Sequence, residues 1–337
     1  MILITGGTGL VGSHLLFNLL KEEKKVRALI RDMNGIDYVK RTFSYYTDDP
    51  DDLLSRIEWI EADITDPYSV HDAISGMDFV YHLAARVSFT PADKRAILRN
   101  NIEGTENVVN ACLEHKVRKL CFVSSVATLG NNVLEEKVTE EKLWTGPHHH
   151  SYYSISKYKS EMIVWRAINE GLNAVIVNPS VIVGPGNWHR SSGQLIQVVW
   201  KGLKYYIEGM TGYVDVRDVV KVMIHLMNGD YSGERYIITS ENLTNKEVLE
   251  MIAGALGKPL PSRVPSPIII QIVCVLDWFK SLFSGDKRRI TMEFISAANE
   301  KRKFSNEKII KVTGIRFIPV HESIQETARL FLQDVSS

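Results

Sequence analysis

The sequence predicts an α/β fold, with a doubly wound parallel sheet and a smaller mixed C-terminal lobe. Three observations support this prediction. Short apolar runs alternate with amphipathic helical patterns through the first half of the chain, a glycine-rich loop joins the first run to the first helix, and the regularity loosens after about residue 180. Strands that alternate with helices in this way form a parallel sheet through right-handed crossovers.

Six apolar runs have the length of strands, and runs such as Cys121-Phe122-Val123 are apolar on both faces, as a covered parallel sheet requires. The predicted strands are Met1–Thr5, Val26–Ile30, Ile57–Ile60, Phe79–His82, Lys119–Val123 and Ala174–Asn178. The predicted helices are Leu10–Lys21, Ser69–Ile74, Asn100–His115 and Tyr152–Glu170.

Gly184-Pro185-Gly186 interrupts the regular pattern. We therefore assign residues 1–180 to the sheet domain and residues 181–337 to a C-terminal lobe that builds the substrate pocket. Within the second half we expect a strand at Arg235–Thr239 and helices at Asn245–Leu256 and Val320–Leu332. The strand and helix within residues 213–239 are expected to return to the sheet domain.

The composition favours a cytoplasmic protein that acts on a small molecule. The 40 basic and 40 acidic residues of the 337 cancel, so no excess of positive charge points to nucleic acid. The three cysteines lack the spacing of a disulfide framework or a metal site. The N-terminus has no basic segment of a signal peptide, and the longest apolar run, Ile268–Leu276, is too short for an integral membrane segment.

A glycine-rich loop follows the first predicted strand and opens the first helix. Such a loop allows close backbone approach to a pyrophosphate, whose charge is stabilised at the helix N-terminus. We therefore predict a Rossmann-type dinucleotide site at Gly6, Gly7, Thr8, Gly9, Leu10, Val11 and Gly12.

The end of the second strand distinguishes NADP from NAD. An acid there binds the ribose 2′-hydroxyl, whereas an arginine favours a 2′-phosphate. Ile30 occupies the position of the acid and Arg31 follows it, so NADP(H) is favoured. Asp32 is the competing residue, and NAD(H) remains the alternative.

Tyr153 and Lys157 stand four residues apart at the start of a predicted helix. The strand before that helix ends in Ser124-Ser125, and open α/β sheets bind ligands at strand ends. A phenol is a weak acid–base at neutral pH, and a nearby ammonium is expected to lower its pKa. A serine hydroxyl can hold a carbonyl oxygen, so these residues predict proton transfer beside a nicotinamide.

Several further motifs make the chain resemble the extended short-chain dehydrogenases/reductases, the NAD-dependent epimerase/dehydratase family. Besides the glycine loop and Tyr153…Lys157, they are Asp63-Ile64, His82-Leu83-Ala84-Ala85, Asn101-Ile102-Glu103-Gly104-Thr105, Ser124-Ser125 and Val214–Val219. The resemblance implies catalytic roles for Ser125, Tyr153 and Lys157, with Lys157 also on the nicotinamide ribose. It implies that Asp63 and Ile64 flank the adenine, that Ala84 and Ala85 line the cofactor path, and that Asn101 supports the site.

The stretch Asn178–Pro185 is similar to that of dihydroflavonol-4-reductase-like members, which implies cofactor contacts for Pro179 and Val181. Sugar-nucleotide dehydratases carry Asp-Glu after the active-site serine or threonine, whereas this chain has Val126-Ala127. The Asn-Trp-Tyr signature of plant cinnamoyl reductases is also absent before Lys157.

Residues near the predicted site are candidates for substrate contact. They are Ser88, Phe89, Tyr152 and Gln194. Three consecutive histidines, His148–His150, cannot all bind one ion, so no metal is predicted. Apolar stripes on Asn100–His115 and Tyr152–Glu170 predict a homodimer through a four-helix interface.

Three functions remain open. The favoured function is an NADP(H)-dependent oxidoreductase that interconverts a carbonyl and an alcohol on a small molecule, with Tyr153 as acid–base. The alternative is a nucleotide-sugar epimerase with tightly bound NAD. A non-catalytic NADP(H)-binding regulator is the third, and the intact Ser125–Tyr153–Lys157 set argues against it.

Overall fold

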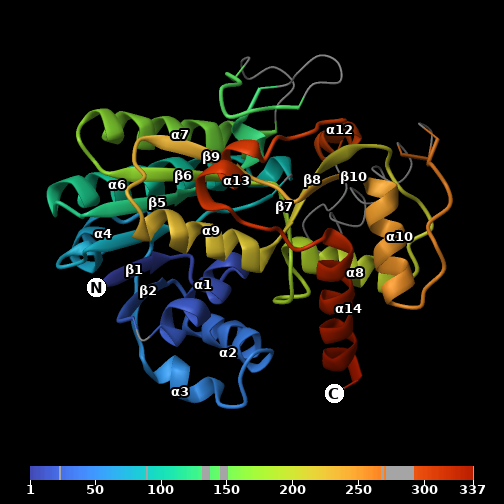
Figure 1. Cartoon of the computed structure of the whole chain (residues 1–337), viewed down its shortest axis with the longest axis horizontal. Helices are drawn as coiled ribbons and strands as arrows, with labels where there is room; N and C mark the ends of the chain where they lie inside the picture. The colour runs from blue at the N-terminus through green and yellow to red at the C-terminus, as the bar shows by residue number, and fades with distance from the viewer. Residues whose placement is uncertain are drawn as a thin grey trace.

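A seven-stranded parallel sheet forms the centre of the fold (Figure 1). The computed structural model describes residues 1–22, 24–88, 90–130, 137–144, 151–266, 269–270 and 292–336. The strand order is β3-β2-β1-β4-β5-β6-β9. The strands are β1 (Ile2–Thr5), β2 (Val26–Ile30), β3 (Ile57–Glu61), β4 (Phe79–His82), β5 (Lys119–Val123), β6 (Ala174–Pro179) and β9 (Glu234–Ile238).

Helices cover both faces of this sheet. Successive residues of a strand point to opposite faces, so each strand contributes to two cores. Ile2 and Ile4 of β1 pack in one core and Leu3 packs in the other. The first core contains residues of α1 (Leu10–Lys21), α2 (Ile36–Ser44), α9 (Val216–Asn228) and α13 (Glu307–Thr313). The second contains residues of α4 (Pro67–Ile74), α6 (Gly104–Glu114) and α7 (Tyr152–Asn169).

The C-terminal lobe is built on a small mixed sheet of order β10-β8-β7. Its strands are β7 (Val181–Val183), β8 (Met210–Asp215) and β10 (Glu241–Thr244). An apolar core joins α8 (Ser191–Trp200), α10 (Asn245–Ala255) and α14 (Val320–Ser336). The remaining elements are α3 (Pro50–Ser55), α5 (Lys94–Leu98), α12 (Met292–Asn299), the 3₁₀ turns η1 (Met33–Gly35), η2 (Pro91–Asp93) and η4 (Val126–Thr128), and the π-helical turn η3 (Arg99–Glu103).

The predicted doubly wound parallel sheet with a smaller mixed lobe is confirmed. Each of the six predicted strands agrees with the observed one to within one residue at either end. The helix predicted at Asn100–His115 differs, because its first turn is the π-helical η3 and regular α-helix begins at Gly104. The predicted homodimer remains a prediction, and the apolar residues Val108, Val109 and Val164 of its helices pack in the sheet core.

Candidate active site

The carboxyl ends of β1 and β4 are joined by a buried polar network beneath the glycine loop. Thr5 Oγ1 lies 2.7 Å from His82 Nδ1 and accepts a hydrogen bond from the backbone N–H of Ala84 at 3.1 Å. His82 Nε2 lies 3.0 Å from Thr105 Oγ1. Burial lowers the pKa of His82 to about 3, and the nearby charge of Lys157 acts in the same direction. His82 is therefore a neutral structural link between two strand ends.

The glycine loop packs too closely for side chains at two positions. Gly6 has a φ of +74°, and a Cβ there would lie 2.8 Å from the backbone N of Ala84. A Cβ at Gly12 would lie 2.2 Å from the carbonyl oxygen of Gly6. Gly9 is the N-cap of α1 and its side-chain-free backbone leaves the helix N-terminus open. This cradle fits the pyrophosphate of a dinucleotide.

A second helix N-terminus meets the glycine loop in a small cleft. The cleft is lined by Thr8, Gly9, Leu10, Ser13, Tyr38, Thr42, Gly184, Gly186, Asn187, Arg190, Ser192 and Gly193. Arg190 is the exposed N-cap of α8, and the buried Ser192 Oγ has no hydrogen-bond partner among the described residues. Both side chains suit an anion, and the sequence prediction missed them. The available signal was a helix start at Arg190-Ser191-Ser192, which comes a few residues after Gly184-Pro185-Gly186.

The end of β2 presents a cation. Ile30 is buried, whereas Arg31 is exposed and its Nη1 lies 3.5 Å from Asn100 Oδ1. Asp32 instead caps the following 3₁₀ turn, because its Oδ1 accepts a hydrogen bond from the N–H of Asn34 at 3.0 Å. Asp63 lies nearby. Burial raises its pKa, but hydrogen bonds from Thr65 and the charge of Arg31 lower it overall.

Ile64, Ala84 and Ala85 continue this edge of the sheet. Ile64 is buried, and a Cβ at Gly104 would lie 2.5 Å from its Cδ1, so Gly104 allows α6 to approach this residue closely. Ala84 and Ala85 are half-buried in the turn after β4. These three residues therefore lie on the same edge as the glycine loop, in the path that the sequence predicts for a dinucleotide.

The predicted acid–base pair lies at the start of α7. Ser151 caps this helix by accepting a hydrogen bond from the N–H of Ser154. The hydroxyls of Tyr153 and Ser125 are hydrogen-bonded, so residues from α7 and from the end of β5 meet. Burial raises the pKa of Tyr153, and the hydrogen bond from Ser125 opposes that shift. The sequence predicted that Lys157 would lower the pKa of Tyr153. The pKa is instead raised, because burial of the phenol is the larger effect.

Lys157 is almost fully buried beside the end of β5. Its Nζ donates a 2.7 Å hydrogen bond to the carbonyl oxygen of Val123 and lies 4.5 Å from the centre of the Phe122 ring. Burial lowers its pKa from 10.5 to about 7, and the charge of Glu161 opposes this shift. The cation is therefore held at a cost to stability, which is typical of functional sites.

Lys157→Met should stabilise the protein near pH 6 by about 1–3 kcal/mol, because it removes a buried charge. The loss of the hydrogen bond to the Val123 carbonyl offsets part of this gain. The folded-state pKa of about 7 lies below the unfolded value of 10.5, so the unfolded chain binds more protons between these values. The burial of the Lys157 charge therefore lowers the stability of the wild type fully below pH 7, and this loss of stability shrinks as pH rises from 7 towards 10.5. The measurement is urea unfolding of both proteins at pH 6 and pH 9.

Lys159→Met is the matched control, since Lys159 is exposed on the same helix. The control should change stability little and equally at both pH values. A Lys157→Met protein that is less stable than wild type at pH 6, or that differs from it equally at both pH values, would contradict the prediction.

Asn101 connects the segment after β4 to α7. Its Oδ1 accepts from the N–H of Arg86 at 2.7 Å, and its Nδ2 donates to the carbonyl of Arg86 at 3.1 Å and to Ser156 Oγ at 2.9 Å. Ser156 Oγ in turn donates to the carbonyl of Tyr153 at 2.7 Å. Asn101 lies in the π-helical turn η3, a distortion that often accompanies functional sites. Its amide groups are satisfied within the protein, which favours support over direct contact.

The other predicted residues are spread around this site. Pro179 is buried at the end of β6, and Val181 is 40% exposed at the start of β7. Ser88 Oγ donates to Asp93 Oδ2 at 2.9 Å, and the ring of Tyr152 lies 4.4 Å from Lys94 Nζ. Gln194 is exposed on α8 and donates to the carbonyl of His189 at 2.6 Å. Phe89 lies outside the described residues.

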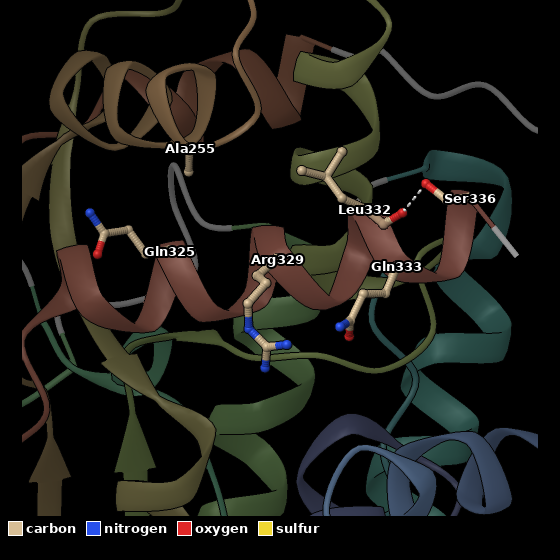
Figure 2. Close-up of a pocket in the computed structure, with 6 residues that line it drawn as sticks. All are labelled: Ala255, Gln325, Arg329, Leu332, Gln333 and Ser336. Carbon is tan, nitrogen blue, oxygen red and sulfur yellow. Dashed lines mark hydrogen bonds between the residues drawn. The ribbon is translucent and has the colours of Figure 1, made fainter.

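A separate hollow lies between α10 and α14, and none of the predicted site residues lines it (Figure 2). Ala255 comes from α10, and α14 contributes Gln325, Arg329, Leu332, Gln333 and Ser336. The hollow contains no nucleophile beyond Ser336, whose hydroxyl donates to the carbonyl of Leu332 at 2.8 Å. It therefore does not compete with the strand ends as a catalytic site.

The described part of the chain contains no cluster of three or more His, Cys, Asp or Glu residues that could hold a metal ion. His148–His150 lie outside that part. None of the helices among the described residues is long and apolar enough to cross a membrane. Most of the apolar run Ile268–Leu276 also falls outside the described ranges.

Comparison with known proteins identifies one family. The model of the NAD dependent epimerase/dehydratase family matches residues 2–239. Sterol demethylase protein B of Methylococcus capsulatus is 29% identical over 277 residues, which cover 81% of this chain and 80% of that protein. Dihydroflavonol 4-reductase of Zea mays is 26% identical and the match covers 78% and 77% of the two chains. The crystal structure of gox2253 superposes with a TM-score of 0.80 at 27% identity, covering 99% of this chain and 98% of that chain.

Proposed function

Since the chain belongs to the NAD dependent epimerase/dehydratase family and is an NAD(P)-dependent oxidoreductase, we propose that it interconverts a carbonyl and an alcohol on a small molecule with NADP(H). The observation that carries this proposal is the hydrogen-bonded pair of Ser125 and Tyr153, with Lys157 one helical turn further on. The set lies at the same sheet edge as the glycine cradle. Named reductases among the relatives support the same class of reaction.

The residues of this chain have distinct roles in the proposed reaction. A bound nicotinamide would supply or accept the hydride. Ser125 holds the carbonyl oxygen of the substrate, and Tyr153 donates the proton that converts the developing alkoxide into an alcohol. Because burial keeps the pKa of Tyr153 raised, its phenol is protonated at neutral pH and suited to reduction. Lys157 binds the nicotinamide ribose and places a cation beside the developing charge.

The dinucleotide would be held along the edge that the glycine loop begins. Gly6, Gly9 and Gly12 leave room for the pyrophosphate at the N-terminus of α1. Arg190 and Ser192 would meet the same pyrophosphate from α8 across the small cleft. The two helix N-termini and one guanidinium together suit a group with two negative charges.

Arg31→Ala should weaken NADPH binding about 10- to 100-fold and leave NADH binding nearly unchanged, because only a 2′-phosphate gains a charge-assisted hydrogen bond from the guanidinium. Arg31 is placed to make that contact, since it is exposed at the end of β2 and held only by a long hydrogen bond to Asn100, while Asp32 is engaged in its own turn. The measurement is a fluorescence titration of cofactor-stripped protein with each nucleotide.

Arg56→Ala, which changes an exposed arginine at the C-cap of α3, serves as the charge control. Asp32→Asn tests the competing acid and should change neither affinity strongly. A wild type that prefers NADH, or an Arg31→Ala protein that keeps its NADPH preference, would refute the NADP assignment.

A nucleotide-sugar epimerase with tightly bound NAD is the second candidate, because the family model covers epimerases. It predicts that NAD survives purification and that turnover produces no net change in nicotinamide absorbance. The reductase predicts a cofactor that exchanges freely and is consumed as the alcohol forms. One turnover assay on the protein as purified therefore separates the two functions.

A further inference from the structure

Glu161 is a buried acid that the proposed chemistry does not use. It lies on α7 one turn beyond Lys157 and two turns beyond Tyr153, and it has no exposed surface. Its Oε2 accepts hydrogen bonds from Ser124 Oγ at 2.5 Å, from Thr128 Oγ1 at 2.8 Å and from Asn178 Nδ2 at 2.9 Å. These three contacts, together with the ion pair to Arg235, hold the carboxylate in one position in the core.

The donors to Glu161 also hold the turn that carries Ser125. Asn178 Nδ2 lies 3.1 Å from the carbonyl oxygen of Ser125, and Thr128 Oγ1 lies 2.9 Å from the same oxygen, so the single proton of this hydroxyl is shared between the carbonyl and Glu161. Ser124 adds the adjacent residue of that turn. The carboxylate therefore fixes the backbone of Ser125 through groups from β6 and from the turn after β5.

The orientation of Asn178 depends on this negative charge. Its Nδ2 faces Glu161, while its Oδ1 is buried without a hydrogen-bond partner among the described residues. The reverse orientation would place a carbonyl oxygen against a carboxylate, which costs more than the unsatisfied oxygen. Glu161 thus selects one of the two amide orientations beside Ser125.

Charge around Glu161 comes from two cations. Its Oε1 accepts from Arg235 Nη1 of β9 at 2.9 Å, and Arg235 also donates to the carbonyls of Glu140 and Lys142. Lys157 is the second cation, and the charge of Glu161 raises its pKa against the larger effect of burial. The other titratable groups facing Lys157 are His82, which is neutral, and Tyr153.

We propose that Glu161 is a positioning residue for the proposed reaction, which holds Ser125 in place through Thr128 and Asn178 and provides a buried counter-charge one helical turn from Lys157. The inference rests on the proposed function only where it is tested by enzyme kinetics. The contacts of the carboxylate are present whatever the substrate is. A role limited to stability would not extend to the protonation of Lys157.

Glu161→Gln tests both parts of the proposal. The amide keeps the shape of the side chain but offers an N–H group to neighbours that are themselves donors, so kcat should fall about 10- to 100-fold with NADPH affinity nearly unchanged. Loss of the negative charge should also move the decline of kcat/KM that follows deprotonation of Lys157, near pH 7 in the wild type, to lower pH by about one pH unit. Glu170→Gln, on an exposed acid of the same helix region, should do neither.

Two further variants separate charge from position. Glu161→Asp keeps the carboxylate and should leave the pH profile near that of the wild type. Thr128→Val removes one link to Ser125 without changing charge, so it should lower kcat without moving the profile. It also provides a test if Glu161→Gln folds poorly.

The NMR titration of the Lys157 ε-carbon in wild type and Glu161→Gln gives a readout that needs no substrate. A lower pKa of Lys157 in the variant supports the proposal, and an unchanged pKa together with an unmoved pH profile overturns it. If the wild type turns over no carbonyl substrate, the proposed function fails, while the NMR comparison still tests Glu161.

Discussion

Tyr153→Phe is expected to lower kcat for carbonyl reduction by about 10²- to 10⁴-fold, the usual contribution of a positioned general acid. Phenylalanine keeps the ring and removes only the hydroxyl that is hydrogen-bonded to Ser125. NADPH affinity should change little, because the glycine cradle and Arg31 are untouched. The measurement is steady-state reduction of a carbonyl substrate combined with a fluorescence titration of NADPH.

Tyr158→Phe provides the matched control on the same helix, since the ring of Tyr158 stacks on Trp144 at 4.6 Å between centres and is not part of the proposed machinery. It should keep near wild-type turnover. If Tyr153→Phe retained more than about a tenth of wild-type kcat, a general-acid role for this residue would be excluded. Equal losses of kcat and NADPH affinity would instead indicate a disturbed fold.

Gly12→Ala should abolish measurable dinucleotide binding and lower stability by about 3 kcal/mol or more. The added Cβ would lie 2.2 Å from the carbonyl oxygen of Gly6 and 2.8 Å from Gly7 Cα. Both atoms are backbone, so no side chain can turn away and the loop itself has to move. Thermal unfolding and NADPH titration measure the two effects.

A glycine-to-alanine substitution in α10 should instead raise the stability of the protein. A Cβ at Gly254 meets nothing within 4 Å, so Gly254→Ala should stabilise the helix by about 0.5–1 kcal/mol. Wild-type NADPH affinity in a folded Gly12→Ala protein would show that this loop is not the dinucleotide site.

The sheet was predictable from the sequence because its inner strands are buried on both faces. The strand β6, whose six residues are all buried, begins with the apolar run Ala174–Val177, which is visible without knowledge of its neighbours. The short β7 was missed, since its three residues acquire strand character only by pairing with β8 more than 30 residues later. α2 and α8 were missed as well, and each spans only nine or ten residues, so its apolar pattern is short.

The candidate site was predictable where its residues lie close together in the chain. The spacing of Tyr153 and Lys157 on one helix, and the glycines of a single loop, are local patterns. Glu161 continues the same helical spacing, but an isolated acid on a helix ordinarily faces solvent, so nothing local distinguished it. Trp165 on the same helix also donates to it, but its other donors, Ser124, Thr128, Asn178 and Arg235, stand between 17 and 74 residues away and become neighbours only in the folded sheet.

The pairing of Glu161 with Arg235 has a consequence for protein synthesis. Arg235 is made 74 residues after Glu161, which at ribosomal rates of about 5–20 residues per second is a delay of roughly 4 to 15 s. In the later part of this interval, once β6 has been made, it has no β9 beside it, and its open edge is available to chaperones or to other nascent chains. The catalytic half of the chain is therefore expected to stay inert and aggregation-prone on the ribosome until the ninth strand emerges.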